Sequence, residues 1–422
     1  MSIVIENVMI VTQNADREIK KGSILVEDGR IKEISEKTLF GDTVISGKYA
    51  AVPGFVNLHA HVAMSLLRGM VDDVSLDKFL EGTFKVDAQR TREDIYAGAM
   101  LGMVEMLGSG ITTFVDFYYG EDIIAEAAEA LGMRAHLAWC VLDEKFTTQK
   151  GSPLKNAENF IMKYRTSKFV KPGVAVQGVY VADEDTWLKA KEISEKYGTI
   201  CTYHLAETKR EVYEFMNARH LRPCEFLDKI GFLGEHQIAV HCCYLKRNEI
   251  KALARNRVSV GHCPVSNMKL ASGIAPVPEM LDAGINVGLG TDSNASNNAL
   301  NFLREVHVAG LLHKLFLENA SAMTAQQLLD MMTINGARAI GMEKEIGSIE
   351  VGKKADIVLF NLSAPCLVPT TEKNIVSNIV YSANPAAIDY VLVNGEIKVE
   401  HGRFNRCSEI AEMAENAAKK FL

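Results

Sequence analysis

Histidine and carboxylate side chains recur at the ends of short apolar runs in this 422-residue chain. Five of the eleven histidines and one aspartate occupy such positions: His59, His61, His204, His241, His262 and Asp292. On an extended segment, His59 and His61 are two apart, so their imidazoles leave from one face and can bind one ion. Together with His204 and Asp292 they offer three nitrogens and one carboxylate oxygen. This donor set predicts one divalent metal ion, with Zn²⁺ favoured and Fe²⁺ or Mn²⁺ also compatible.

Two further residues of this pattern could move or orient protons beside such an ion. Glu207 lies three residues after His204, close enough to reach over the metal, and is the candidate proton shuttle between activated water and a substrate nitrogen. His241 could polarise the attacked atom or orient the water. His262 stays open between a substrate contact and support of the ligands. The remaining histidines carry an ordinary structural interpretation: His136, His220, His236, His307, His313 and His401.

The apolar runs themselves predict the scaffold. Strands are expected near residues 55–59, 111–117, 133–142, 173–181, 200–206, 237–243, 257–262 and 285–292. Between them, stretches with apolar residues three and four apart predict helices, which Gly132 and Gly198 would end. Eight strands with intervening helices over roughly 240 residues predict an α/β fold of the (β/α)₈ TIM-barrel type, whose chemistry lies at the carboxyl ends of the strands. An open doubly wound sheet is the alternative, but no glycine-rich phosphate loop follows the first strand.

The two chain ends have a different pattern. Residues 23–34 predict a hairpin around Asp28-Gly29, and residues 389–399 predict another around Asn394-Gly395. We therefore expect one small β-sandwich built from both ends of the chain. The predicted domains are residues 1–52 and 346–422 for this sandwich, the latter with a C-terminal helix, and residues 53–345 for the barrel.

Composition excludes several classes of partner. Lys and Arg total 46 against 53 Asp and Glu, a net charge of −7, which disfavours a nucleic-acid surface. No run of 18 uncharged apolar residues predicts a membrane span. The eight cysteines form no CxxC pair, and no signal peptide is recognisable, so we expect reduced thiols in a cytoplasmic protein. A homo-oligomer stays open, because the leucine-rich segment 300–317 could face a core or an interface.

At these residues the chain resembles the amidohydrolase superfamily, in particular its deaminase and chlorohydrolase branch, which includes the S-adenosylhomocysteine and 5′-methylthioadenosine deaminases. The motifs that carry the resemblance are Pro53–His61, Met64–Gly69, His204–Glu207, His241–Cys243, His262–Leu270 and Gly290–Asp292. The resemblance implies a mononuclear site with His59, His61, His204 and Asp292 as ligands. It also implies that Glu207 protonates a ring nitrogen and that His241 holds the attacking water by a hydrogen bond. Asp292 would pass the water proton to departing ammonia.

Departures from the family pattern bear on the substrate. Phe79 stands where a tryptophan is usual, Asp87 where a glutamate grips ribose hydroxyls, Trp139 where an arginine holds a carboxylate, and Gln177 where a histidine is usual. Because no guanidinium replaces that arginine nearby, the case for S-adenosylhomocysteine itself is weakened. Trp139 and Phe79 could instead stack on an aromatic heterocycle. The candidate substrate-binding residues are Phe79, Asp87, Trp139, Gln177, Glu207 and His262.

The sequence thus predicts an enzyme that removes ammonia by hydrolysis from an aminated N-heterocycle, a small-molecule substrate, with a purine base or adenosine-type nucleoside favoured. Alternatives on the same fold are hydrolysis of another ring substituent such as chloride, or deamination of guanine, a pterin or a smaller ring. A third alternative is an inactive binding protein. The presence of all the proposed ligands and of Glu207 argues against it, since such descendants usually lose them.

Overall fold

The computed structural model describes residues 2–74, 76–147 and 149–421. The chain forms two compact units. The first consists of Met1–Asn57, Val104–Thr113 and Asn301–Cys407, and the second of Leu58–Met103, Phe114–Leu300 and Ser408–Leu422. These units are defined by contacts within the chain, and the domain boundaries 1–52, 53–345 and 346–422 remain a prediction from the sequence.

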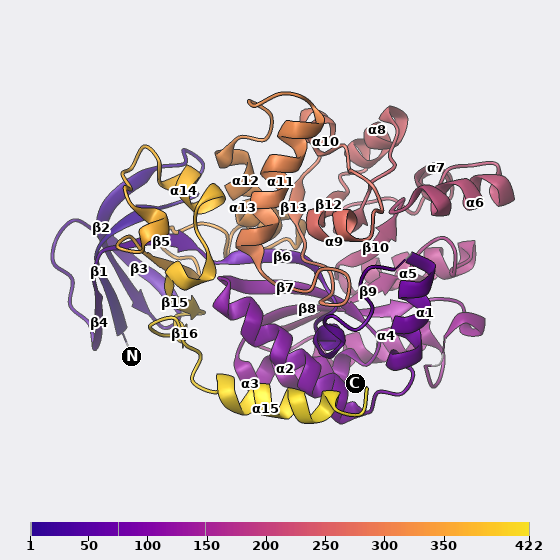
Figure 1. Ribbon diagram of the computed structural model, residues 1–422, viewed down its shortest axis with the longest axis horizontal. Coiled ribbons are helices and arrows are strands. Elements are labelled where there is room, and N and C mark those ends of the chain that lie inside the picture. Colours follow the sequence, from indigo (N-terminus) through magenta and orange to yellow (C-terminus); the bar gives the residue numbers. More distant parts are fainter. Residues whose placement is uncertain (1, 75, 148, 422) are drawn as a thin grey trace. The chain divides into compact units, whose positions relative to one another are not determined.

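Both ends of the chain contribute to one sheet in the first unit, as predicted (Figure 1). Its strands are β1 (Ser2–Val11), β2 (Ile19–Glu27), β3 (Arg30–Ser35), β4 (Thr43–Ser46), β5 (Tyr49–Pro53), β14 (Ile357–Asn361), β15 (Ile388–Val393) and β16 (Glu396–Val399). Their order is β16-β15-β14-β5-β1-β2-β3, with β4 paired to β1. The two predicted hairpins are confirmed: Asp28-Gly29 and Asn394-Gly395 all have φ between 49° and 77°, the left-handed conformation that such tight turns need.

The eight predicted barrel strands are also present, and they form a second sheet. They are β6 (Phe55–Ala60), β7 (Ile111–Tyr118), β8 (Arg134–Val141), β9 (Val170–Val176), β10 (Cys201–Leu205), β11 (Gln237–His241), β12 (Ser259–His262) and β13 (Val287–Leu289). The strands pair in chain order, and the pairs from β8 to β13 are parallel. A parallel bridge between Ala60 and Asp292, with the Asp292 N–H donating to the His59 carbonyl at 2.9 Å, joins the first strand to the end of the last. The TIM-type barrel is therefore confirmed, and the open doubly wound sheet is wrong.

Helices connect the strands and follow the expected local signals. The Asp183 carboxylate accepts from the Thr186 N–H at 2.9 Å at the start of α5 (Glu184–Tyr197), and Gly198 ends that helix at φ 62°. Gly132 ends α3 (Glu121–Leu131) in the same way at φ 63°. The helices are α1 (Leu76–Asp87), α2 (Arg92–Gly108), α3 (Glu121–Leu131), α4 (Pro153–Tyr164), α5 (Glu184–Tyr197), α6 (Lys209–Arg219), α7 (Pro223–Lys229), α8 (Arg247–Arg255), α9 (Pro264–Lys269), α10 (Val277–Asp282), α11 (Phe302–Phe316), α12 (Ala325–Met332), α13 (Ile334–Ala339), α14 (Ile375–Tyr381) and α15 (Cys407–Ala418), with short 3-10 turns at Val62–Leu67, Glu144–Phe146, Pro365–Leu367 and Pro385–Ala387.

The predicted bounds of the fourth barrel strand differ most from the observed ones. The fourth barrel strand is Val170–Val176, whereas the sequence suggested residues 173–181. Lys171-Pro172 resembles a turn, but both residues pair with β8 in register. The strand ends at Val176 because the next carbonyl, that of Gln177, accepts instead from the His204 ring at 2.9 Å.

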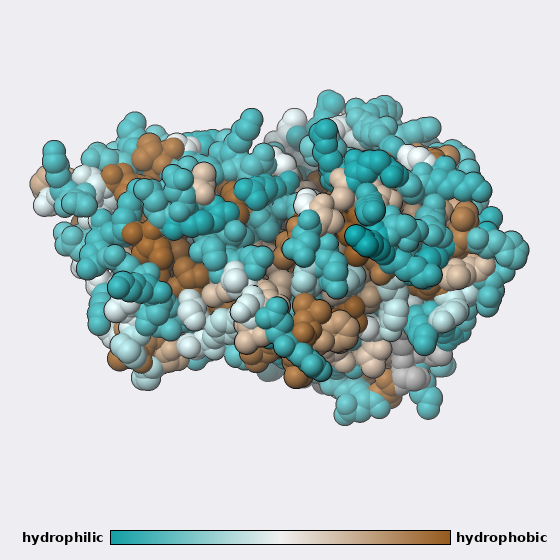
Figure 2. All heavy atoms as spheres, turned by 90° about the horizontal axis from the view of Figure 1, so that it is seen from above, coloured by the Kyte–Doolittle hydropathy of each residue, from teal (hydrophilic) through white to brown (hydrophobic). Residues whose placement is uncertain are grey.

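The surface agrees with the charged composition. Hydrophilic residues cover most of the face shown in Figure 2, with smaller hydrophobic areas between them. Among the described helices, none combines the length and the apolar character needed to cross a membrane.

Candidate metal centre and active site

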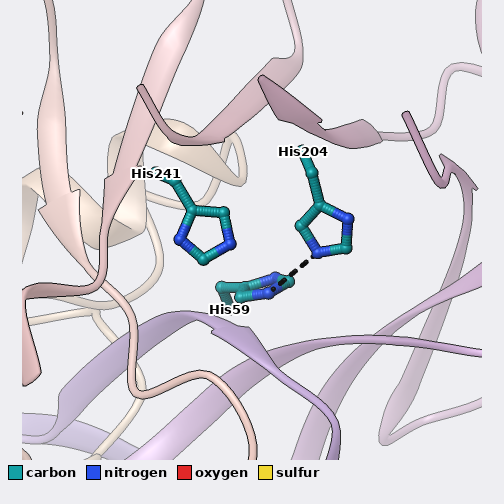
Figure 3. Close-up of side chains that lie close together, drawn as sticks. All are labelled: His59, His204 and His241. Atoms are coloured by element: carbon teal, nitrogen blue, oxygen red, sulfur yellow. Dashed lines mark hydrogen bonds between the residues drawn. The ribbon is translucent and has the colours of Figure 1, made fainter. Parts of the chain in front are cut away.

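The histidines predicted as ligands converge at the carboxyl ends of the barrel strands. Figure 3 shows His59, His204 and His241 with their rings directed toward one another. The Nε2 atoms of His59 and His204 lie 3.3 Å apart. A second, overlapping group joins His59 to His61 and Asp292, with the Asp292 Oδ1 3.4 Å from Nε2 of His61 and 3.7 Å from Nε2 of His59. The four predicted ligands are thus spread over two groups of the second unit that share His59, and His241 belongs to the first of them.

Hydrogen bonds on the far side of three rings fix their tautomers. Nδ1 of His204 donates to the Gln177 carbonyl at 2.9 Å, and Nδ1 of His61 donates to the Phe117 carbonyl. Nδ1 of His241 donates to Oδ1 of Asn267 at 2.9 Å. A carbonyl oxygen can only accept, so each ring carries its hydrogen on Nδ1 in its neutral form. Each Nε2 lone pair is then available at the centre of the group.

Burial keeps the imidazoles of His204 and His59 neutral. Burial lowers the pKa of His204 to about 3, and neighbouring His241 and His61 act in the same direction. The pKa of His59 falls well below its ordinary value for the same reasons. Burial alone would raise the pKa of Asp292, but His61, His241 and the Ser266 hydroxyl outweigh it and lower that pKa. Neutral imidazoles and an ionised carboxylate are the forms that bind a metal ion.

The residues present fit one divalent ion of the zinc type. The hydroxyl of Ser266 donates to Oδ2 of Asp292 at 2.6 Å, and the backbone N–H of Ser293 donates to Oδ1 at 2.7 Å. Such outer contacts orient a ligating carboxylate, as the carbonyls orient the imidazoles. His59, His61, His204 and Asp292 would thus supply three nitrogens and one oxygen, with His241 at the edge of the group.

Glu207, the candidate proton shuttle, lies beside this group. Its Oε2 is 3.8 Å from Nε2 of His241, and its Oε1 accepts from the Ser272 hydroxyl at 3.0 Å. The side chain is 20% exposed, so part of it is accessible to solvent. A carboxyl group in this position can exchange a proton with a bound molecule.

The backbone is strained where it presents these side chains. Ala206, His241, Cys242 and Asp292 all have positive φ, between 49° and 70°, which non-glycine residues rarely adopt. His241 pairs in register with Leu205, so regular strand geometry would direct both side chains to the same face, away from His204. The left-handed turn at His241 breaks that alternation, and its ring lies 5.3 Å from that of His204. Such strain is typical of functional sites.

Asp87 and Phe79, predicted to contact the substrate, occupy the segment around α1. Both carboxylate oxygens of Asp87 accept from tyrosines, Oδ1 from Tyr118 and Oδ2 from Tyr119, and Arg90 lies 2.8 Å from Oδ1. The carboxylate that was expected to grip ribose hydroxyls is thus already hydrogen-bonded within the protein. Phe79 is buried in a cluster with Leu67 and Ala295, so in this structure it packs as a core residue.

Trp139 is not brought together with the histidines. Cys140 belongs to the buried cluster that contains Phe117, and the ring of Phe117 stacks on that of His204 with the ring centroids 4.5 Å apart. Because successive side chains along a strand point to opposite faces, Trp139 faces the other side of β8. The Trp139 ring there packs against Phe160 of α4 at 5.7 Å, and its Nε1 donates to Gln149 at 2.9 Å. The sequence could not fix this orientation, because the neighbouring positions 139 and 140 are both compatible with a buried strand.

Gln177 and His262 lie closer to the ligands. The Gln177 side chain accepts from the Cys140 thiol at 3.5 Å and donates to the Tyr180 hydroxyl at 3.3 Å, while its backbone orients His204. His262 is fully buried at the end of β12, and its carbonyl accepts from the Gly290 N–H at 2.8 Å. It belongs to neither candidate ligand group.

Several supporting residues were not identified from the sequence. Ser266 contacts Asp292, and Asn267 contacts His241. Ser272 contacts the side chain of Glu207, and Glu211 contacts its backbone. Ser266 and Asn267 fall inside the His262–Leu270 motif, which was the only signal for them. The others are common residue types whose partners become clear only in the folded chain.

The chain is similar to known proteins over most of its length. A model of the Amidohydrolase family matches residues 50–398. A 5′-deoxyadenosine deaminase of Methanobrevibacter smithii is 38% identical over 97% of this chain and 95% of its own length. A 5-methylthioadenosine/S-adenosylhomocysteine deaminase of Thermodesulfovibrio yellowstonii is 39% identical over 94% and 92%, respectively. Among solved structures, a zinc-bound adenosine deaminase from Xanthomonas campestris is similar with a TM-score of 0.95 at 29% identity, covering 99% of this chain and 98% of that one.

Proposed function

Because this chain belongs to the amidohydrolase family, we propose that it is a zinc-dependent hydrolase that removes ammonia from an adenosine-type nucleoside. The observation that carries the proposal is the convergence of His59, His61, His204 and Asp292 beside Glu207 and His241. The names of the two relatives support this substrate class. Hydrolysis would convert the exocyclic C–NH₂ of the ring to a carbonyl and release NH₃, with one water consumed.

His59, His61, His204 and Asp292 would hold the zinc ion, which lowers the pKa of a bound water from 15.7 to ~7. Glu207 would protonate the ring nitrogen next to the carbon that bears the amine, which makes that carbon electrophilic. Its other oxygen is held by Ser272, so the carboxyl group keeps one orientation during the transfer.

His241 and Asp292 would manage the attacking water and its proton. Because the Nδ1–H group of His241 donates to Asn267, the Nε2 atom of His241 is an acceptor. It can hold the water in line with the ring carbon. The Asp292 carboxylate can take the proton that the water loses and pass it to the departing amine. The leaving group is then neutral ammonia rather than an amide anion.

Within this substrate class we favour nucleosides that lack an amino-acid carboxylate on the 5′ substituent. The family's carboxylate-binding arginine is replaced by Trp139, which faces α4. The Asp87 carboxylate is hydrogen-bonded by Tyr118 and Tyr119, so a ribose would have to displace these contacts or bind beside them. Gln177, His262 and Phe79 stay candidate substrate contacts.

The setting in which the protein acts is also part of the proposal. All eight cysteines are free thiols, and six of them are buried, which suits a reducing, cytoplasmic location. The partner that we propose is the small-molecule substrate; a nucleic-acid partner is disfavoured by the net charge of −7. Assembly into a homo-oligomer stays a prediction to be tested by measuring the mass in solution.

A substrate panel with one matched variant tests the function. Ammonia release is measured with adenosine, 5′-deoxyadenosine, 5′-methylthioadenosine, S-adenosylhomocysteine, guanine, cytosine and a pterin, and chloride release with a chlorinated triazine. We expect ammonia from the adenosine-type compounds, and a kcat lower by about 10²–10⁴-fold in Glu207→Gln. The variant should keep the wild-type zinc content, because Glu207 is not among the four proposed ligands. Chloride release without ammonia, or full activity of Glu207→Gln, would contradict the proposal.

A further inference from the structure

The first turn of α6 carries a carboxylate that does more than cap the helix. Thr208 is the N-cap residue, and its hydroxyl accepts from the Glu211 N–H at 3.1 Å. In the ordinary capping box, a glutamate three residues after the cap reaches back to the N–H of the cap residue itself. The segment Thr208–Glu211 has this spacing, so the sequence pattern alone indicates only a helix start.

The Glu211 side chain reaches farther back than a capping box requires. Its Oε2 accepts from the backbone N–H of Glu207 at 2.8 Å, and its Oε1 accepts from that of Ala206 at 3.1 Å. These two peptide groups precede the helix and link it to β10. One carboxylate therefore holds, through both oxygens, the short loop that presents Glu207.

The loop needs such a restraint because its conformation is strained. Ala206 has φ 49°, in the left-handed region that alanine adopts at a cost of about 1–3 kcal/mol unless the surroundings enforce it. The Ala206 carbonyl accepts from the Tyr244 N–H at 3.0 Å, which fixes the other side of the same residue. Beyond the loop, the Glu207 carboxylate accepts from the Ser272 hydroxyl at 3.0 Å.

The position of Glu211 is electrostatically unfavourable, which argues against a role in capping alone. Burial and the neighbouring Glu207 carboxylate raise the pKa of Glu211 to about 7. The Thr208 hydroxyl already provides the side-chain cap of α6. Capping of α6 therefore does not account for the two hydrogen bonds from Glu211 to the loop.

We propose that Glu211 is a positioning residue, whose carboxylate holds the Ala206 and Glu207 peptide groups so that the Glu207 side chain stays aimed at the reacting ring. The inference rests on the proposed function, since Glu207 must act as the proton donor for its position to matter to the rate. It assigns to Glu211 no contact with the substrate or the metal ion.

The test compares Glu211→Gln with Thr208→Ala. An amide has one acceptor oxygen and one donor group, so Glu211→Gln can accept from only one of the two N–H groups and opposes the other. We expect kcat to fall about 10–100-fold from the misplacement of Glu207, with KM changed by less than about twofold and zinc content unchanged. Thr208→Ala removes the cap but leaves the two hydrogen bonds from the Glu211 carboxylate to the N–H groups of Ala206 and Glu207. It should therefore lower the melting temperature and leave kcat near that of wild type.

A crystal structure of Glu211→Gln gives a readout that does not depend on activity. We expect the Ala206–Glu207 backbone to move and the contact between Glu207 and Ser272 to be lost. An unchanged loop, a wild-type kcat, or a loss of zinc in Glu211→Gln would each overturn the inference. An equal fall of kcat in Thr208→Ala would do so too, because helix capping would then explain the effect. If wild type itself releases no ammonia, the proposed function fails, and the crystal structure still decides whether Glu211 holds the loop.

Discussion

The sheet built from both chain ends and the carboxyl ends of the barrel strands bury different kinds of side chain. In the first unit, the sheet built from both chain ends buries an almost wholly aliphatic cluster that includes Ile5, Ile10, Ile24 and Leu392, each 0% exposed. At the carboxyl ends of the barrel strands, the buried groups are instead imidazoles and a carboxylate, and the backbone carries several left-handed residues.

The difference separates residues that stabilise the fold from residues that the chemistry requires. Each aliphatic side chain contributes about 1.5–3 kcal/mol by leaving water. A buried polar group, in contrast, costs free energy unless it is hydrogen-bonded, and left-handed residues add about 1–3 kcal/mol of strain each. Substitutions in the sheet should therefore change stability without changing the reaction, whereas substitutions at the strand ends should do the reverse.

The largest effect is expected at a proposed ligand. His59→Ala removes a nitrogen that contributes to both ligand groups, so zinc should be lost and activity should fall about 10³-fold or more. Because the imidazole is buried for binding rather than for packing, the variant should be about as stable as wild type stripped of metal by a chelator. Metal analysis, ammonia release and urea unfolding check this. Stoichiometric zinc in the variant would remove His59 from the ligand set.

The matching change in the sheet is Ile24→Ala. Ile24 is fully buried in the aliphatic cluster, so the free energy of unfolding should fall by about 2–5 kcal/mol. The kcat per zinc-loaded, folded molecule should stay within about twofold of that of wild type, measured below the temperature at which the variant begins to unfold. A large fall in kcat with little loss of stability would erase the contrast between the two regions.

A smaller effect is expected one contact away from the ligands. Asn267→Ala removes the acceptor that fixes Nδ1 of His241, which should lower kcat/KM about 10–100-fold with the zinc retained. Asn267→Asp keeps an oxygen at this place and should recover much of the activity. If the alanine and aspartate variants are equally impaired, the hydrogen bond to His241 is not what Asn267 provides.

The scaffold and the main site residues could be predicted because they depend on local patterns. Apolar runs of strand length located the barrel, and residue type at the end of the runs made His204, His241 and Asp292 candidates for the site. The substrate side was harder to predict. Whether position 139 or position 140 faces the interior depends on the register of the strand. An error of one residue in the predicted register directs every side chain to the opposite face. The structure directs Cys140 inward and Trp139 toward α4.

The supporting contacts could not be predicted because they join residues far apart in the chain. Ser272 lies 65 positions from the carboxylate of Glu207 that it holds, and Asn267 lies 26 positions from His241. The left-handed conformation of His241 could not be predicted from residue type, because the usual signal for that conformation is glycine. Glu211 did match a known pattern, that of a helix cap, and this pattern concealed its bonds to the preceding loop.

The weakest effect concerns pH and extends the comparison to a buried barrel residue away from the ligands. Burial lowers the pKa of His136 on β8 to about 3, against about 6.5 in an unfolded chain. As pH falls below 6.5 the unfolded chain binds a proton that the native chain does not, so stability is lost in that direction. Between pH 7 and 5.5 wild type should lose about 1 kcal/mol more than His136→Gln, measured by urea unfolding. The sheet variant Ile24→Ala, which removes no titrating group, should follow the wild-type slope with a constant offset. Parallel curves for wild type and His136→Gln would show that His136 does not couple stability to pH.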